Sequence, residues 1–172
     1  MEHDWQVCAD NAVTWARQHL GSTAYTSRCL AFVEDAYERS NHVEIFGGDF
    51  AGESARIYAA RENTGVPPTG AFAFYDSTGE LFGRRQDWGH VGLCVGDGRV
   101  VHAWDRVRID HYLDIPDLAA PPGWDPPRWV GWTPVQRIFR GCRPKDWEAV
   151  GDASAAAQRM QATRFGEGPG PA

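Results

Sequence analysis

Apolar residues repeat at helical spacing through the first third of the chain. In residues 4–19 they recur every three or four positions, which predicts a helix that ends before Gly21. Apolar residues recur at the same spacing in residues 27–39, which predicts a second helix with Thr26 or Ser27 as its N-cap. A third, shorter helix is expected within residues 50–63.

From residue 67 onward the pattern changes to short apolar runs between glycine and proline turn signals, which is typical of β-strands. One strand is expected in residues 67–79 and two more in the hairpin 89–104. Residues 105–115 either extend the second hairpin strand or add a further one, and a last strand is expected in residues 128–135. Helices followed by strands indicate an α+β fold, with the helices packed on an antiparallel sheet.

Length, composition and charge limit the kind of protein and its partners. With 172 residues, 42% of them hydrophobic, we expect one domain over residues 1–148 and a partly disordered tail at 149–172. The net charge of -6 and the lack of a long basic run argue against nucleic acid, and no stretch approaches the roughly 18 apolar residues that a membrane span needs. The N-terminal residues lack the pattern of a signal peptide, which favours a cytoplasmic protein or export by a non-Sec route. Nothing in the sequence indicates an oligomeric state.

Cys29 is the cysteine whose surroundings point to chemistry. The chain has four cysteines and no CxxC pair, so free thiols are expected. Cys29 falls in the first turn of the second predicted helix, where unpaired N–H groups and the helix dipole favour a thiolate and lower its pKa. Arg28 beside it adds a positive charge. The alternative is that Cys29 is one more small apolar residue on a buried helix face.

The hairpin 89–104, "GHVGLCVGDGRVVHAW", carries one histidine on each strand, and its loop length decides whether they meet. A two-residue loop would place His90 and His102 on opposite faces, because side chains alternate along a strand. A three-residue loop at 96–98 places both on one face as diagonal neighbours, with Gly92 leaving open space beside the rings. We expect the three-residue loop; the alternative is a pair of surface histidines.

Two histidines and a reactive cysteine suggest a proton relay. In such a relay a base accepts the thiol proton, and a second polar group holds the other nitrogen of the base and fixes its tautomer. We assign these roles, in order, to Cys29, His90 and His102. Asp110 or His111 is a rival third member. Zinc binding by the cysteine and the two histidines is a disfavoured alternative, because no motif fixes a further thiol or carboxylate nearby, and no cofactor is expected.

Three blocks of the sequence follow one another in an informative order: "SRCLAFVEDAY" at 27–37, "PPTGAFAFY" at 67–75 and "WGHVGLCVGDGRVVHAW" at 88–104. They are similar to the Cys-bearing helix, the turn into a strand and the His-Val-Gly hairpin of the NlpC-type papain-like cysteine peptidases. These are bacterial cell-wall endopeptidases, with the CHAP amidases as relatives. The resemblance implies a papain-like catalytic core over about residues 1–140.

The resemblance also implies an activity and a set of roles. Members of the family cleave an amide by thiol catalysis, and typically cut the stem peptides of peptidoglycan. By position, Cys29 would be the nucleophile, His90 the base and His102 its orienter, and Tyr25 would match a tyrosine near the oxyanion. An acyltransferase on the same triad, an exported interbacterial toxin and a non-catalytic binding module are the alternatives.

The chain departs from the resembling family at the nucleophile. Residues 28–31 read Arg-Cys-Leu-Ala here, where the family usually has Asp-Cys-Ser-Gly. Arg28 would repel the free amine of a stem peptide, which the Asp and Ser of the family can help to bind. A substrate with a carboxylate or phosphate near this point is therefore expected to suit Arg28 better.

Overall fold

Two long helices form the first layer of the structure. The computed structural model describes residues 4–150, so the tail expected at 149–172 lies almost entirely outside the described residues. Helix α1 (Trp5–Gln18) begins where the Asp4 side chain accepts hydrogen bonds from two backbone N–H groups of the first turn. Its buried residues are small, which lets it lie close against helix α2 (Cys29–Asn41).

Helix α2 begins at Cys29, two residues later than expected. Ser27 has a φ of 63°, outside the helical region, and Arg28 is the N-cap but makes no side-chain cap hydrogen bond. The expected N-cap at Thr26 or Ser27 is therefore wrong. Cys29 is itself the first helical residue, so its backbone N–H belongs to the helix end whose N–H groups have no intrahelical acceptor.

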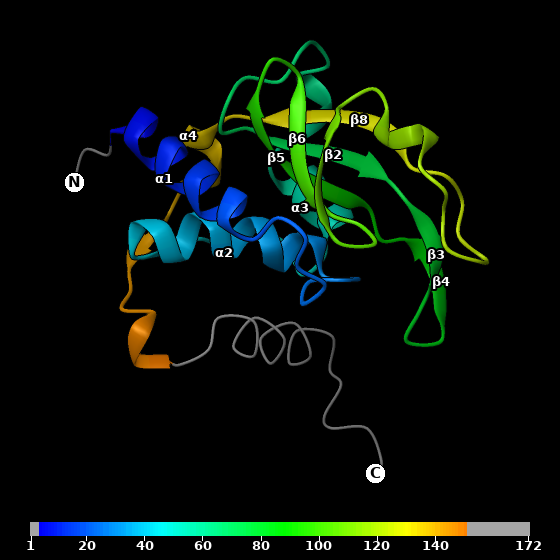
Figure 1. Ribbon diagram of the computed structural model, residues 1–172, viewed down its shortest axis with the longest axis horizontal. Coiled ribbons are helices and arrows are strands. Elements are labelled where there is room, and N and C mark those ends of the chain that lie inside the picture. Colours follow the sequence, from blue (N-terminus) through cyan, green and yellow to red (C-terminus); the bar gives the residue numbers. More distant parts are fainter. Residues whose placement is uncertain (1–3, 151–172) are drawn as a thin grey trace.

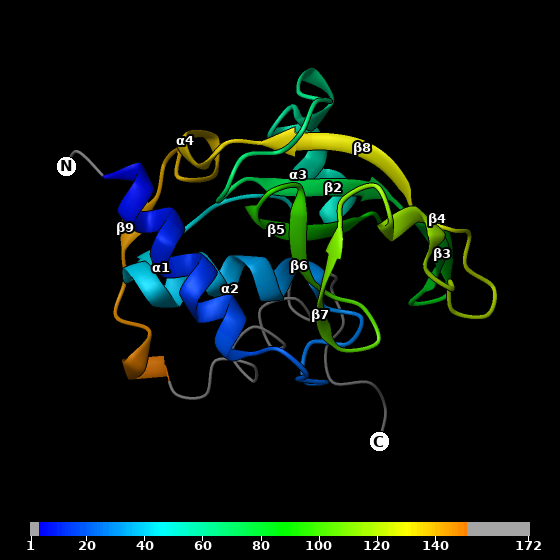
Figure 2. The same cartoon turned by 45° about the horizontal axis from the view of Figure 1, so that its top comes forward.

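A five-stranded antiparallel sheet forms the second layer, with the strand order β7-β6-β5-β2-β8. In chain order, its strands are β2 (Phe72–Asp76), β5 (His90–Gly96), β6 (Arg99–Ala103), β7 (Val107–His111) and β8 (Arg128–Thr133). Figures 1 and 2 show α1 and α2 lying along one face of this sheet. The expected α+β class, with helices packed on an antiparallel sheet, is confirmed.

The sheet buries side chains on both of its faces. Apolar residues of the three central strands pack against the two helices: Phe72, Phe74, Val91, Leu93 and Val101. A second cluster lies on the opposite face and includes Ala73, Tyr75, Cys94, Val100 and Tyr112. His90 is the cross-strand partner of Tyr75 and belongs to this second face. The histidines therefore share a face with a smaller cluster and not with the main core.

Shorter elements fill the connections. Helix α3 (Ala51–Ile57) and the 3-10 turn η1 (Ala60–Glu62) occupy the segment where a third helix is expected. A separate two-stranded hairpin, β3 (Thr78–Leu81) and β4 (Arg84–Asp87), is not indicated by the hydrophobic pattern. The remaining elements are β1 (Val43–Glu44), which pairs with β9 (Arg143–Pro144), η2 (Ile115–Asp117), α4 (Val135–Ile138) and η3 (Glu148–Val150).

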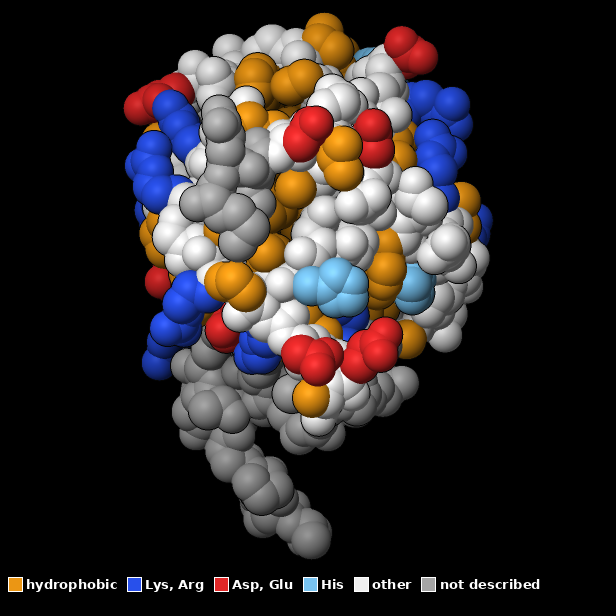
Figure 3. Space-filling view, turned by 90° about the vertical axis from the view of Figure 1, so that its left-hand side faces the viewer, with side chains coloured by type: hydrophobic (Ala, Val, Ile, Leu, Met, Phe, Trp, Pro, Cys, Tyr) orange, Lys and Arg blue, Asp and Glu red, His pale blue; other side chains and the backbone are white. Residues whose placement is uncertain are grey.

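One face of the molecule carries mixed charge. On the face shown in Figure 3, acidic and basic side chains are interspersed, and the basic ones lie mostly toward its edges. Among residues 4–150, no helix has both the length and the apolar character that crossing a membrane requires.

The β5–β6 hairpin brings its histidines together, but through a different loop from the expected one. The loop has two residues, 97–98, whose φ values of 53° and 71° are those of a type I′ turn, so the expected three-residue loop at 96–98 is wrong. The register then shifts at Val95, which forms a β-bulge and moves the alternation of side chains by one position. A two-residue loop with a one-residue bulge gives the same alternation as a three-residue loop. His90 and His102 therefore share a face, as expected.

Gly92 lies on the shared face of the hairpin, where it is closely packed. A Cβ at this position would lie 2.3 Å from Cγ1 of Val100, 2.9 Å from Cβ of His102 and 3.0 Å from the carbonyl oxygen of Val101. The expected open space beside the rings is therefore wrong. The missing side chain instead lets residues of β6 approach the backbone of β5.

Replacing Gly92 with alanine is expected to destabilise the fold by about 1–3 kcal/mol, as overpacking of a filled core does. The matched control is Gly65→Ala, because nothing lies within 4 Å of a Cβ at Gly65. Urea unfolding followed by tryptophan fluorescence measures both variants. Equal free energies of unfolding for the two would contradict the close packing at Gly92.

Candidate active site

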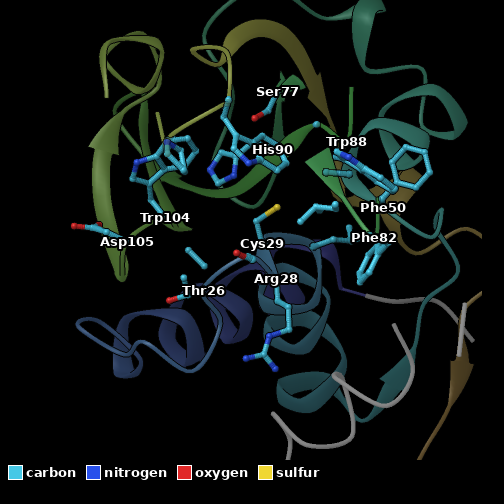
Figure 4. A pocket seen from close by; sticks show the side chains of 18 of the residues that line it. Thr26, Arg28, Cys29, Phe50, Ser77, Phe82, Trp88, His90, Trp104 and Asp105 are labelled. Carbon is cyan, nitrogen blue, oxygen red and sulfur yellow. The ribbon is translucent and has the colours of Figure 1, made fainter. Parts of the chain in front are cut away.

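A pocket of about 740 Å³ lies beside the start of α2 and the start of β5. Cys29 and His90, which the sequence assigns as nucleophile and base, both line it. Figure 4 shows the sulfur of Cys29 pointing into the pocket on the side where His90 lies. Cys29, the first residue of α2, and His90, the first residue of β5, thus place a thiol and an imidazole at the same pocket.

The polar side chains behind the pocket form a continuous hydrogen-bonded chain. Nε2 of His90 lies 2.8 Å from Nδ1 of His102, and Nε2 of His102 lies 2.8 Å from Oδ2 of Asp110. Arg108 holds the carboxylate with two hydrogen bonds, from Nε to Oδ2 at 2.7 Å and from Nη2 to Oδ1 at 3.1 Å. The members come from the neighbouring strands β5, β6 and β7, so the register of the sheet sets their spacing.

The carboxylate at the end of this chain determines where the protons are. Ionised Asp110 only accepts hydrogen bonds, so His102 must donate from Nε2 and, when neutral, accept at Nδ1. The proton between the two rings then belongs to Nε2 of His90. Nδ1 of His90 is left with a lone pair, which is the state that a general base requires.

Burial and neighbouring charges maintain this protonation state. The hydrogen bond with His102, reinforced by Arg108, lowers the pKa of Asp110 to about 2. Burial lowers the pKa of His102, although the Asp110 carboxylate acts in the opposite direction. Burial and the proximity of His102 lower the pKa of His90 well below its usual value. Both rings are therefore neutral at neutral pH, and Asp110 is charged.

Burial also controls the thiol of Cys29. Loss of water raises its pKa to about 11, although the backbone N–H groups of Val91, Leu30 and Cys29 itself act to lower it. The expected lowering at the helix N-terminus is therefore wrong, because desolvation outweighs the favourable N–H groups. The site rests as a neutral thiol and a neutral imidazole.

Asp110 belongs to the site in addition to His102, whereas the sequence indicated it only as a rival. His102 pairs with Arg108 across β6 and β7, and Asp110 is two residues further along the same face. The alternation of apolar and charged residues in 107–111 indicates a strand with Arg108 and Asp110 on one face. Only the register of β7 on β6 shows that this face is the one that carries His102. The other rival, His111, does not join the chain and accepts a hydrogen bond from a backbone N–H two residues further on.

Tyr25 and Arg28 do not take the places expected of them. Tyr25 does not line the pocket: it is 1% exposed, and its hydroxyl donates to Oδ2 of Asp35 at 2.6 Å, so its expected position near the oxyanion has no support in the structure. Arg28 borders the pocket, but its guanidinium points away from it (Figure 4) and donates to the carbonyl oxygen of Ala24. The expected attraction of Arg28 for a substrate anion therefore has no support in its orientation.

No protein-family model matches this chain, and no curated protein matches its sequence. The chemistry therefore has to be argued from the geometry of the site. Within residues 4–150, the four cysteines are free thiols. In the same part of the chain, no group of three or more His, Cys, Asp or Glu side chains is arranged to hold a metal ion.

The raised pKa of Cys29 predicts how alkylation of its thiol depends on pH. Only the thiolate reacts, and the pKa is about 11, so the rate constant with iodoacetamide should rise about tenfold per pH unit between pH 7 and pH 9. Mass spectrometry of the peptide that contains Cys29 measures this rate, with glutathione as an unperturbed thiol in parallel. A rate constant that does not change between pH 7 and pH 9 would indicate that Cys29 and His90 already form a thiolate–imidazolium pair. That result would contradict a neutral thiol beside a neutral imidazole.

Proposed function

We propose that the protein is a thiol-dependent amide hydrolase with a papain-like catalytic domain. Cys29 is the nucleophile and His90 is the base. The main support is the direction of the hydrogen-bond chain: Asp110 and His102 leave Nδ1 of His90 unprotonated, on a ring that lines the same pocket as Cys29. A purely structural pair of histidines does not require a base-ready nitrogen beside a cysteine.

The first half of the reaction forms a thioester. The thiol proton of Cys29 moves to Nδ1 of His90 as the sulfur bonds to the carbonyl carbon of the substrate. The carbonyl electron pair moves onto oxygen, where the backbone N–H of Cys29 at the start of α2 is one donor. The C–N bond then breaks, and the leaving amine takes the proton from His90.

The second half of the reaction restores the enzyme. Water attacks the thioester carbon and gives a proton to Nδ1 of His90. The C–S bond then breaks, the carboxylic acid leaves, and the sulfur recovers its proton. His102 and Asp110 are positioning residues in both halves. They hold the ring of His90 in one tautomer and stabilise the positive charge that it carries while it holds the extra proton.

Peptidoglycan stem peptides are the substrate that we propose to test first. The support for them is the resemblance of the three sequence blocks to the NlpC-type peptidases, which covers both Cys29 and the histidine hairpin. The orientation of Arg28 removes one objection, because its guanidinium does not point into the pocket and would not repel an amine there.

Purified muropeptides are expected to be cleaved by the wild type and not by Cys29→Ala, because the variant lacks the attacking sulfur. The products should form an amine and an acid whose masses together exceed the substrate by one water. Liquid chromatography with mass spectrometry measures them. Equal cleavage by Cys29→Ala would contradict thiol catalysis, and intact muropeptides with both proteins would contradict the peptidoglycan substrate.

Asp110→Asn is expected to lower kcat by about a hundredfold or more, as loss of a group that orients a general base does. An amide carries no charge and can present its NH2 to His102, which permits the reversed tautomer. The control is Asp114→Asn, which removes an exposed carboxylate in the segment after β7. Steady-state kinetics should show the loss mainly in kcat, and equal kcat values for the two variants would exclude a positioning role for Asp110.

A further inference from the structure

Five aromatic side chains line the pocket around Cys29, and we name them the aromatic wall: Phe50, Phe82, Trp88, Trp104 and Trp124. The ring centroid of Trp88 lies 5.3 Å from the ring centroid of Phe50 and 6.1 Å from the ring centroid of Phe82. The ring centroid of Trp104 lies 5.0 Å from the ring centroid of His90, so the aromatic wall extends to His90, the proposed base. Figure 4 shows Phe50, Phe82 and Trp88 on one side of Cys29 and Trp104 on the other.

Hydrogen bonds and close packing hold the aromatic wall in place. Nε1 of Trp88 donates to the carbonyl oxygen of Gly79 at 3.1 Å, and Nε1 of Trp104 donates to that of Ala119 at 3.3 Å. Trp124 lies directly on the backbone of Gly79, where a Cβ would be 2.0 Å from its ring. The polar groups of two indoles are thus satisfied within the protein, and the rings are positioned to contact a ligand.

Phe82 stands at the tip of the β3–β4 hairpin in a conformation that phenylalanine rarely adopts. Leu81 pairs with Arg84, so Phe82 and Gly83 form a two-residue turn with φ values of 54° and 71°. Such a turn favours Asn, Asp or Gly at both positions, and a bulky residue is strained there. Phe82 is also 53% exposed. A strained and exposed ring at the edge of a pocket is explained if it contacts a ligand.

The charged side chains that line the pocket do not provide a positive charge for an anionic ligand inside it. They are Arg28, Asp49 and Asp105. Arg28 points away, and Asp105 makes ion pairs with the neighbouring Arg106 and Arg108. A carboxylate placed among the rings would lose its water without gaining an opposite charge. An uncharged apolar group gains free energy from the same transfer.

We propose that the aromatic wall binds a large, uncharged apolar group attached to the amide that Cys29 attacks. This inference rests on the proposed thiol chemistry but not on a peptidoglycan substrate. An aromatic side chain and a linear acyl or alkyl chain share the required chemistry, and a pocket of about 740 Å³ accepts either. Phe82 and Trp104 are the residues that contact this group from opposite sides of Cys29.

Three chloroacetamides with the same electrophile test the proposal: N-benzylchloroacetamide, N-octylchloroacetamide and chloroacetylglycine, which carries a carboxylate. The thiolate of Cys29 displaces chloride from each, and the attached group must then lie in the pocket. Rate constants at Cys29, measured at pH 9 by peptide mass spectrometry, are divided by those of glutathione with the same probe. We expect the benzyl or the octyl probe to exceed the carboxylate probe by about tenfold or more, and the faster of the two identifies the preferred shape.

Phe82→Gly tests the role of the strained ring. Glycine adopts a positive φ readily, so we expect the midpoint of thermal unfolding to stay within a few degrees of the wild type. The preference for the apolar probe over the carboxylate probe should fall about threefold or more, since part of the apolar contact is lost. The control is Leu113→Ser, which removes an equally exposed apolar side chain, 53%, that does not line the pocket, and it should retain the preference.

The outcomes separate this inference from the proposed function. Equal relative rates for the three probes, or an unchanged preference in Phe82→Gly, would overturn the role of the aromatic wall while Cys29 still reacts as a nucleophile. If no probe labels Cys29 although each reacts with glutathione, both the proposed nucleophile and this inference are contradicted. Faster apolar labelling in the wild type, reduced in Phe82→Gly and retained in Leu113→Ser, supports the inference.

Discussion

The hydrogen bond between Nε2 of His90 and Nδ1 of His102 is the interaction on which the rest of the site depends. It joins neighbouring strands, so it requires both rings on one face and close approach of β6 to β5. The bulge at Val95 provides the first condition, and the missing side chain of Gly92 provides the second. Asp110 then gives the bond its direction, because a carboxylate at the far end accepts and never donates. With the direction reversed, Nδ1 of His90 would carry a proton and would not serve as a base.

The burial that orders the two histidines also limits the reactivity of Cys29. A thiol with a pKa of about 11 contains almost no thiolate at neutral pH, even at a helix N-terminus. In the proposed reaction, proton transfer to His90 must therefore accompany the attack of sulfur on the substrate. The same exclusion of water also disfavours an imidazolium at His90, and the negative charge at Asp110, which reaches His90 through His102, acts against that penalty. Desolvation thus favours general-base catalysis over a preformed ion pair.

Local patterns in the sequence predict the two long helices, the strands of the main sheet and the shared face of the histidines. They do not distinguish a three-residue loop from a two-residue loop with a bulge, because both give the same alternation at His90 and His102. They indicate Asp110 only as a rival to His102, because its contact with His102 depends on the register of β7, which tertiary pairing sets. The pKa of Cys29 depends on how much water reaches the thiol, and a sequence carries no direct measure of that. The β3–β4 hairpin is largely polar, so its hydrophobic pattern gives no signal.

The proposed catalytic groups and the outer part of the aromatic wall come from different parts of the fold. The hydrogen-bonded histidines lie on the central sheet, and Cys29 lies at the start of α2. Phe82 comes from the β3–β4 hairpin, and Trp124 comes from a later loop. Arg85 of the hairpin joins these two segments, because it donates to the carbonyl oxygen of Gly123 at 2.7 Å and to Asp125 at 3.1 Å. This hairpin makes its own two-stranded sheet, so Phe82 lies outside the five-stranded register that aligns His90, His102 and Asp110. In the proposed function, the strained contact of Phe82 with a ligand would therefore be separate from the strands that align the two histidines.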